Sequence, residues 1–439
     1  MNDITACFAF LKYCLGYKEN MSRVIAGMNW HELYSFASKQ ALLGLCFEGI
    51  ERLGEEYPEE LKRNPIGREL LMTWMGKAQQ IRRQNMKVNA VASKLFAMLR
   101  VDGMRCCVLK GQGNALMYPN PYSRTPGDID VWINASRERI MEYASKKFEL
   151  GDDIRLQHLE TSLDGVPVEL HFFPCSMNNP IYHARLQKWF RRNADLQCSH
   201  IVGLPDEAGD IAIPTTAFNV VYQLTHLYHH FFDEGIGMRQ IIDYFLVVND
   251  FSKNVFLNND LSNPSVSLSK GSSTSHPSPL SSEERDVTAL RCSEPLRSKD
   301  GGASKPSPNC AGWDRLDAKG NTTSAALVVV QRELKHLGLW KFSGAVMYVL
   351  HEALGLPEEK MIAPMDEKRG KLLLAEILNG GNFGQHFTKY GHFTQQGMAK
   401  KYFLKIWRNM HFVRYFPAEA LSEPIFRTWH FFWRLKHRR

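Results

Sequence analysis

The chain has 439 residues, more than one typical domain, and 44% of them are hydrophobic, an ordinary share for a globular protein. Its net charge of +8 is compatible with nucleotides, RNA or an anionic surface and does not choose among them. The nine cysteines include no C-x-x-C pair and no apolar run is long enough to span a bilayer, which argues against a disulfide framework, a zinc site and an integral membrane protein.

The N-terminal stretch and the cysteines bear on the compartment. Residues 1–15 contain an apolar patch, but they have no leading basic region and no small-residue cleavage site of the kind a secretory signal carries. Cys106 and Cys107 are adjacent in a segment that reads as a buried strand, which fits a reducing environment. We therefore expect a cytoplasmic protein.

Residues 1–100 are expected to form an N-terminal helical region. Apolar residues recur at three- and four-residue spacing from Trp30 to Leu53 and again from Glu69 to Leu99. This spacing is typical of helices that bury one face.

A glycine turn follows a short buried strand that we expect at Cys106 to Leu109. Gly111 and Gly113 allow the chain to turn directly into a helix, whose free backbone N–H groups and dipole would favour an anion. Lys110 adds a cation at the same place. Many strand–helix turns need glycine for their geometry alone, so the glycine pair by itself is a weak indication of an anion site.

The segment 118–126 contains three prolines, which predict a fixed loop without regular structure. Arg124 ends this loop just before an acidic strand. The sequence leaves two alternatives open for Arg124, a contact with a phosphate or an ion pair with an aspartate.

The most informative stretch is 127–133, where two aspartates are separated by one residue. The β-branched and aromatic residues around them favour a strand, so Asp128 and Asp130 point to the same face. Two carboxylates on one rigid face can hold a pair of Mg²⁺ ions, the arrangement used for in-line phosphoryl transfer. The alternative is a strand end with two solvated aspartates.

A β-hairpin is expected around the two-residue turn at 164–165, because polar and apolar residues alternate on both sides of it. Pairing across this turn sets polar residues opposite each other, Glu160 with Glu169 and His158 with His171. On this shared face Glu169 would supply a third metal carboxylate, and the histidines would contact phosphate or move protons. Each histidine taken alone is more simply a satisfied or exposed residue.

Two helices follow the core motifs. Ser136 is expected to cap a helix from Arg137 to Lys147. Thr215 or Thr216 is expected to cap a further helix that runs through residue 228.

This further helix carries a histidine cluster, His226, His229 and His230, followed by Asp233. His226 and His230 are one helical turn apart, as two metal ligands would be, but no H-E-x-x-H motif is present. We therefore expect the histidines to line a cleft or pack beneath it rather than to bind a metal.

Arg239 and Asp243 have the i, i+4 spacing of an ion pair on a helix surface, and contact with the active site is the alternative. Residues 252–322 then change character, because Ser, Pro, Asn, Gly and Lys dominate and aromatic residues become rare. Such a segment cannot bury enough apolar surface to offset chain entropy, so we expect a disordered insertion in a surface loop.

Residues 323–439 return to a helical pattern. Amphipathic helices are expected from Ala325 to Leu337 and from Phe342 to Leu354, and a glycine pair at 380–381 breaks the pattern. The end, 426–439, mixes aromatic with basic residues and has no acidic residue. We favour a terminal helix docked through its aromatic residues, with peripheral membrane contact or RNA binding as alternatives.

The core motifs resemble the uncharacterised bacterial nucleotidyltransferase family of the polymerase-β-like superfamily. The match covers about residues 100–175, and the glycine-containing stretches at 235–243 and 380–384 are similar to the family less specifically. The residues that carry the resemblance are Leu109-Lys110-Gly111, the Tyr-Pro-x-Pro loop with Arg124, Gly127-Asp128-Ile129-Asp130 and Val168-Glu169-Leu170-His171. The usual hydrophobic-Gly-Gly/Ser turn is here Leu109-Lys110-Gly111, so Lys110 would substitute in binding phosphate.

The resemblance implies an α+β fold, with a small mixed sheet as the nucleotidyltransferase core at 101–200, a helical region lining the cleft at 201–251, and helical regions at both ends. It implies Mg²⁺, or Mn²⁺ in its place, and an NTP such as ATP as the donor. The expected site residues are the metal-binding and catalytic Asp128, Asp130 and Glu169 and the nucleotide-binding Lys110, Gly111, Gly113, Arg124, His158 and His171.

We therefore expect transfer of a nucleoside monophosphate from an NTP to an acceptor hydroxyl on RNA, a protein or a small molecule. The rival is a non-catalytic nucleotide- or RNA-binding module on the same fold, although three clustered carboxylates without a metal would not help such a module to bind anions. A membrane-peripheral scaffold that uses the C-terminus is the third class.

Overall fold

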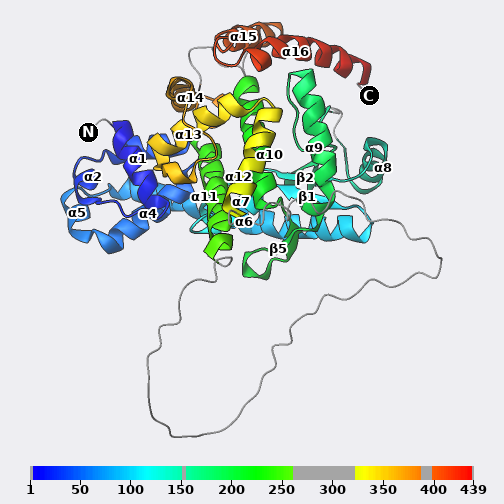
Figure 1. Cartoon of the computed structure of the whole chain (residues 1–439). Coiled ribbons are helices and arrows are strands. Elements are labelled where there is room, and N and C mark those ends of the chain that lie inside the picture. The colour runs from blue at the N-terminus through cyan, green and yellow to red at the C-terminus, as the bar shows by residue number, and fades with distance from the viewer. Residues whose placement is uncertain (1–2, 151–154, 261–321, 387–397, 438–439) are drawn as a thin grey trace, which may run out of the picture.

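The computed structural model describes residues 3–150, 155–260, 322–386 and 398–437. Within these ranges the protein is an α+β fold, in which helices surround a small mixed sheet (Figure 1). No helix in the described ranges is both long enough and apolar enough to cross a membrane.

The N-terminal region is helical as predicted. Its helices are α1 (Asp3–Cys14), α2 (Ser22–Ala26), α3 (Trp30–Lys39), α4 (Leu43–Glu56), α5 (Pro58–Arg63) and α6 (Arg68–Val101). The pattern from Trp30 to Leu53 forms two helices rather than one, because the chain turns at Ala41, where φ is 57°. The turn lets the Gln40 side chain donate to the Ile377 carbonyl and accept from the Met238 N–H.

The central sheet has the strand order β1-β2-β4-β3. Its strands are β1 (Cys106–Leu109), β2 (Ile129–Ile133), β3 (His158–Leu163) and β4 (Val166–His171). β2 runs antiparallel to β1 and parallel to β4, and β4 runs antiparallel to β3. The two acidic strands β2 and β4 therefore lie side by side in the middle of the sheet.

The predicted hairpin register is confirmed, since His158 pairs with His171 and Glu160 pairs with Glu169. Asp164 has φ 49° and the glycine after it has φ 72°, as a type I′ turn requires. The two-residue turn therefore sets which side chains of β3 and β4 share a face.

Short elements connect and flank the sheet. They are α7 (Gly111–Ala115), η1 (Pro121–Ser123), α8 (Arg137–Lys147), α9 (Pro180–Ser199), β5 (Ile201–Gly203), η2 (Pro205–Glu207) and β6 (Asp210–Ala212). Ser136 caps α8 as predicted, because its side chain accepts from the Arg139 N–H. The loop at 118–126 is not wholly irregular, since the Asn120 side chain accepts from the Tyr122 N–H and starts the 3-10 turn η1.

The two faces of the sheet are packed differently. Ile129, Val131 and Ile133 of β2 join a cluster with the second half of α6 and with α8. Trp132, on the opposite face, stacks on Phe218 and belongs to the larger core. This alternation leaves Asp130 on the face covered by the helices that follow α9.

The remaining helices form the other half of the molecule. They are α10 (Thr216–Asp233), α11 (Met238–Asp260), α12 (Thr322–His336), α13 (Trp340–Leu354), η3 (Glu358–Lys360), α14 (Glu367–Gly380), η4 (Asn382–Gly384), α15 (Met398–Met410) and α16 (Pro417–His437). α15 and α16 lie together at one end of the molecule (Figure 1). Thr215 precedes α10 but makes no side-chain cap, because its hydroxyl donates to Gln197 Oε1.

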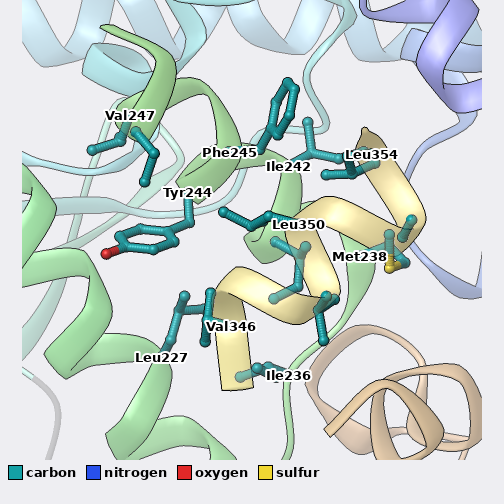
Figure 2. Packing of buried hydrophobic residues seen from close by; sticks show 14 of the residues in the cluster. Leu227, Ile236, Met238, Ile242, Tyr244, Phe245, Val247, Val346, Leu350 and Leu354 are labelled. Atoms are coloured by element: carbon teal, nitrogen blue, oxygen red, sulfur yellow. The ribbon is translucent and has the colours of Figure 1, made fainter. Parts of the chain in front are cut away.

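The helices on either side of segment 252–322 pack into one core. Ile242 and Phe245 of α11 are fully or nearly fully buried with Leu350 and Leu354 of α13, beside Leu227 of α10 (Figure 2). α11 continues to residue 260, so the predicted disordered insertion begins too early, because residues 252–260 are helical. Residues 261–321 lie outside the described residues.

Candidate active site

A pocket with about 510 Å³ of empty space opens over β1 and β2. Its walls come from the turn between β1 and α7, the loop before β2, and helices α10 and α11, with η4 closing one side. The polar and charged residues that line the pocket are Lys110, Asn114, Arg124, Asp128, Asp130, Gln223, His226, Arg239, Gln240 and Asp243.

Three carboxylates meet beside this pocket. Asp130 of β2 and Glu169 of β4 are directly paired in the parallel register, and Asp128 precedes β2 on the same side. His171 Nε2 lies 3.0 Å from Asp130 Oδ1 and 3.1 Å from Glu169 Oε2. Lys110 Nζ lies 3.1 Å from Asp130 Oδ1. The structure thus brings together the residues that the sequence placed on one acidic face, and we call Asp128, Asp130 and Glu169 the carboxylate face.

The pKa values of the groups on and beside the carboxylate face shift in different directions. The neighbouring charge of Asp130, then burial, and then Glu169 raise the pKa of Asp128 to about 6. Burial would also raise the pKa of Asp130, but Lys110 and His171 outweigh it and hold that pKa below its ordinary value. Burial alone would lower the pKa of His171, yet its contacts with Asp130 and Glu169 raise it to about 9. His171 is therefore a cation at neutral pH.

The carboxylate face fits a divalent cation such as Mg²⁺. Carboxylate oxygens are the ligands that Mg²⁺ prefers, and Asp128 still faces unrelieved repulsion from Asp130. His158, Glu169 and His171 also bring three ligand atoms within 4.8 Å of one another. We favour the carboxylates, because His171 Nε2 is already engaged by Asp130 and Glu169.

Lys110 lies in an uncommon backbone conformation for a residue with a side chain, with φ 53°. From there its ammonium group donates to His226 Nε2 at 2.8 Å as well as contacting Asp130. Burial, and then the charge of Lys110, hold the pKa of His226 well below its ordinary value. His226 is therefore a neutral acceptor that helps to position the lysine, and it lines the pocket as expected.

The two glycines of the turn have different surroundings. Gly111 lines the pocket with φ 37°. Gly113 is buried, and a Cβ added there would lie 3.0 Å from the Ile213 side chain. Gly113 is not among the residues that line the pocket, so this position does not support the expected phosphate contact, and close packing against Ile213 accounts for the glycine.

Arg124 is held by an aspartate that the sequence did not indicate. Its Nε and Nη2 donate to the two oxygens of Asp243 at 2.9 and 2.8 Å, and both side chains are buried. Tyr118 donates to the same carboxylate at 2.8 Å. Of the two alternatives for Arg124, the ion pair is present, and it builds the floor of the pocket.

The predicted ion pair between Arg239 and Asp243 is wrong. Arg239 instead donates to the Thr125 carbonyl at 3.2 Å, and its guanidinium lies 5.5 Å from the centre of the Phe383 ring. α11 is buried at this point, so Asp243 turns inward to Arg124 instead of lying on a helix surface. Arg239 Nε is buried without a hydrogen-bond partner in the described part of the chain, which leaves this cation available to a ligand.

Three pocket residues, Asn114, Gln223 and Phe383, were not predicted from the sequence. Asn114 and Gln223 bind each other through both amide groups, at 3.0 and 2.6 Å, and fix α7 against α10. Phe383 forms an apolar wall with a left-handed backbone, φ 52°. A long-range amide pair has no local pattern, whereas the glycine-rich stretch at 380–384 is the signal that pointed toward Phe383.

His158 does not line this pocket. It is 8% exposed, and neither ring nitrogen has a hydrogen-bond partner among the described residues, although Nδ1 lies 3.3 Å from Glu169 Oε2. Burial and then the charge of His171 lower the pKa of His158 to about 4, so it is neutral at pH 7. Its expected contact with the nucleotide is not supported by this position, and His158 instead lines a second cavity with His229.

The residues of this site lie in a part of the chain that is similar to a known protein family. A family described as uncharacterised nucleotidyltransferase matches residues 26–262. The chain belongs to this family. The matched range contains the whole carboxylate face and every residue that lines the pocket except Phe383. The part of the chain that matches the nucleotidyltransferase family therefore forms the site, and Phe383 from the C-terminal part closes one side of it. No curated protein and no solved structure matches the chain.

Proposed function

We propose that the protein transfers a nucleoside monophosphate from an NTP to an acceptor hydroxyl, using Mg²⁺, or Mn²⁺, held by Asp128, Asp130 and Glu169. The observation that carries this proposal is the pairing of β2 with β4, which sets Asp130 beside Glu169 at the edge of a pocket rich in cations. Membership of a nucleotidyltransferase family supports the reaction type.

The pocket has the groups that a nucleoside triphosphate needs. Lys110 and Arg239 supply positive charge, and the backbone N–H groups at Gly111 supply hydrogen-bond donors for phosphate oxygens. Phe383 offers an aromatic face on which a base can stack. Arg124 contributes charge, but its two bonds to Asp243 make it chiefly a structural support.

In the proposed reaction the acceptor oxygen forms a bond to the α-phosphorus, the bond to the bridging oxygen breaks, and pyrophosphate leaves. Bound metal ions would neutralise charge on the attacking and leaving oxygens. Glu169 would take the proton from the acceptor hydroxyl, because it is the carboxylate farthest along the sheet from the Lys110 turn. His171 would keep the carboxylates of Asp130 and Glu169 in place through its two contacts. Most of the rate enhancement would come from positioning and charge neutralisation.

The test uses α-³²P-labelled ATP, GTP, CTP and UTP with Mg²⁺, the purified protein and a cell extract that supplies acceptors. We expect label to move from one NTP to an acceptor with the wild type and with Asp195→Asn, a substitution at an exposed aspartate of α9. We expect the rate to fall by about 10²–10³-fold or more with Asp130→Asn. Full activity of Asp130→Asn would reject the assignment, and NTP binding without Mg²⁺ dependence or turnover would favour the non-catalytic binding module.

A further inference from the structure

A second cavity, with about 710 Å³ of empty space, lies on the other side of the carboxylate face. The first pocket, proposed above to hold the NTP and called the nucleotide pocket from here on, is lined by Asp130 of β2 and by Lys110, which follows β1. The second cavity is lined by His158 of β3 and by Ser176 and Asn178, which follow β4. Because the strand order is β1-β2-β4-β3, the carboxylates of β2 and β4 stand between the two spaces.

This placement matters for the proposed reaction. In-line transfer requires the attacking oxygen and the leaving pyrophosphate to approach the phosphorus from opposite sides. If the triphosphate lies beside Lys110, the acceptor must reach the phosphorus from the side of Glu169. The second cavity is the space that adjoins this side, since His158 lies 3.3 Å from Glu169.

The wall nearest the carboxylates has unused hydrogen-bonding capacity. His158 is more than nine-tenths buried, and neither of its ring nitrogens has a hydrogen-bond partner in the described part of the chain. His229, on α10, lines the same cavity and has a buried Nδ1 that is likewise without a partner there. Buried imidazole nitrogens are costly when unpaired, so a polar ligand group would stabilise them.

The charged residues of the second cavity are neutralised within the protein. Arg155 contacts Glu160 at 2.6 Å. Arg427 pairs with Asp233 at 2.9 Å and with Glu423. In contrast to the nucleotide pocket, where Arg239 is available, the cations here already have carboxylate partners. The cavity therefore suits a neutral ligand better than a phosphate or a nucleic acid.

An apolar groove continues from the second cavity. The two share Leu156, Asn178 and Phe426 in their walls, and the groove has about 1200 Å³ of empty space. Ile425 and Trp429 of α16 line it from one side and are 73% and 51% exposed. The facing wall is the chain at 173–183. A polar chamber next to the carboxylates thus opens onto an apolar surface.

We infer that the acceptor is a neutral small molecule that has both a hydroxyl group and an apolar part. The hydroxyl lies beside His158 and Glu169, and the apolar part lies in the groove between α16 and the chain at 173–183. This inference rests on the proposed nucleotidyl transfer for the role of the hydroxyl, and on the cavity and groove for the class of compound.

The test separates a cell extract by the properties that the inference specifies. The extract is first passed through a filter that retains molecules larger than about 3 kDa. The filtrate is then passed through anion- and cation-exchange resins, and the unbound material is loaded on a reversed-phase resin. We expect acceptor activity in the compounds that the reversed-phase resin retains. Activity that stays above the filter, binds an ion exchanger or passes through the reversed-phase resin would overturn the inference while leaving nucleotidyl transfer intact.

Two variants connect the acceptor with the groove. Trp429→Ala and Ile425→Ala should each raise the KM for the retained fraction by about tenfold, because each removes apolar surface from the binding site. The affinity for the Mg²⁺–NTP complex should not change. Leu421→Ala is the matched control, since Leu421 is an exposed apolar residue of α16 that does not line the groove. An equal effect of Leu421→Ala would contradict a specific role for the groove.

A direct binding measurement keeps the inference testable if no NTP supports transfer. Saturation-transfer NMR with the retained fraction should show binding to the wild-type protein and to Leu421→Ala, with a weaker signal for Trp429→Ala. Absence of transfer together with this binding pattern would reject the proposed reaction and retain the ligand class. Absence of binding by the wild type would overturn the inference.

Discussion

The nucleotide pocket and the second cavity share one row of carboxylates but treat positive charge in opposite ways. Around the pocket, Arg239 makes no ion pair with a carboxylate among the described residues, and its buried Nε has no hydrogen-bond partner there, whereas Lys110 contacts Asp130. Around the second cavity, Arg155 and Arg427 are occupied by acidic neighbours. The difference teaches that the number of basic residues near a site says little about the charge of its ligand; what matters is which of them already have a partner.

The largest effect on stability is expected from breaking the buried ion pair between Arg124 and Asp243 at the floor of the pocket. Arg124→Met would leave Asp243 as a buried charge without its guanidinium partner, which costs about 3–5 kcal/mol of the free energy of unfolding. Urea denaturation measures this loss. The double variant Arg124→Met/Asp243→Asn should recover part of it, and a single variant as stable as the wild type would show that the buried pair is not structurally important.

A smaller effect, of about 3 kcal/mol, is expected from pH at Glu419, which is bonded to the segment that contributes Asn178 to the second cavity. Glu419 of α16 accepts from the N–H groups of Asn178 and Asn179, and burial raises its pKa to about 7. The folded protein therefore keeps this proton to a higher pH than the unfolded chain does. Stability should fall as pH rises from about 4.5 to about 7, because the unfolded state releases the proton first.

The measurement is the free energy of unfolding at several pH values for the wild type and Glu419→Gln. Gln keeps an acceptor for one of the two N–H groups and cannot ionise, so the variant should lack this part of the pH dependence. Identical pH profiles for the two proteins would show that Glu419 does not titrate in this range. The comparison with the pocket is sharpened because Glu419 supports the segment behind the second cavity and does not line the nucleotide pocket.

An effect of about 10²-fold is expected on catalysis from Lys110→Met. The substitution removes the ammonium group that contacts Asp130 and His226 and that would bind phosphate, so both the rate and the affinity for the NTP should fall. Initial rates over a range of NTP concentrations separate the two. An unchanged rate would exclude Lys110 from the proposed phosphate site.

The smallest effect most directly tests the difference between cations with and without an acidic partner. Arg239→Gln should raise the KM for the NTP by about tenfold, because it removes a cation of the pocket that makes no ion pair with a carboxylate among the described residues. Arg427→Gln should leave this KM unchanged, since Arg427 is already engaged by Asp233 and Glu423. Equal changes in the two variants would break the distinction between available and neutralised cations.

The sequence predicted the parts of the site that depend on local rules. A two-residue turn at 164–165 determines the pairing of Glu160 with Glu169, and the alternation along β2 puts Asp130 beside Glu169. The predicted strand began too early, because β2 starts at Ile129 and Asp128 lies just before it. The Ser136 cap and the β1 strand follow from equally local preferences. These features need no knowledge of the rest of the chain.

The parts that failed depend on contacts between distant segments. Asp243 had a correctly spaced partner in Arg239, but burial of α11 gave it to Arg124 instead. Gly113 could not be distinguished from a ligand-binding glycine until Ile213 was seen beside it. The break at Ala41 likewise serves contacts of Gln40 with Met238 and Ile377, which are distant in the sequence. Peripheral membrane contact of the C-terminus, the alternative that the sequence did not favour, is untested.

The shared core of α11 and α13 has a consequence for the continuity of the chain. Ile242, Phe245, Leu350 and Leu354 hold the two helices together by side-chain packing, although 261–321 separates them in sequence (Figure 2). A single backbone cut within 261–321 should therefore leave two fragments that stay associated, and the fragments should reassemble when they are expressed as separate polypeptides. The carboxylate face would then come entirely from the first fragment and the Phe383 wall from the second.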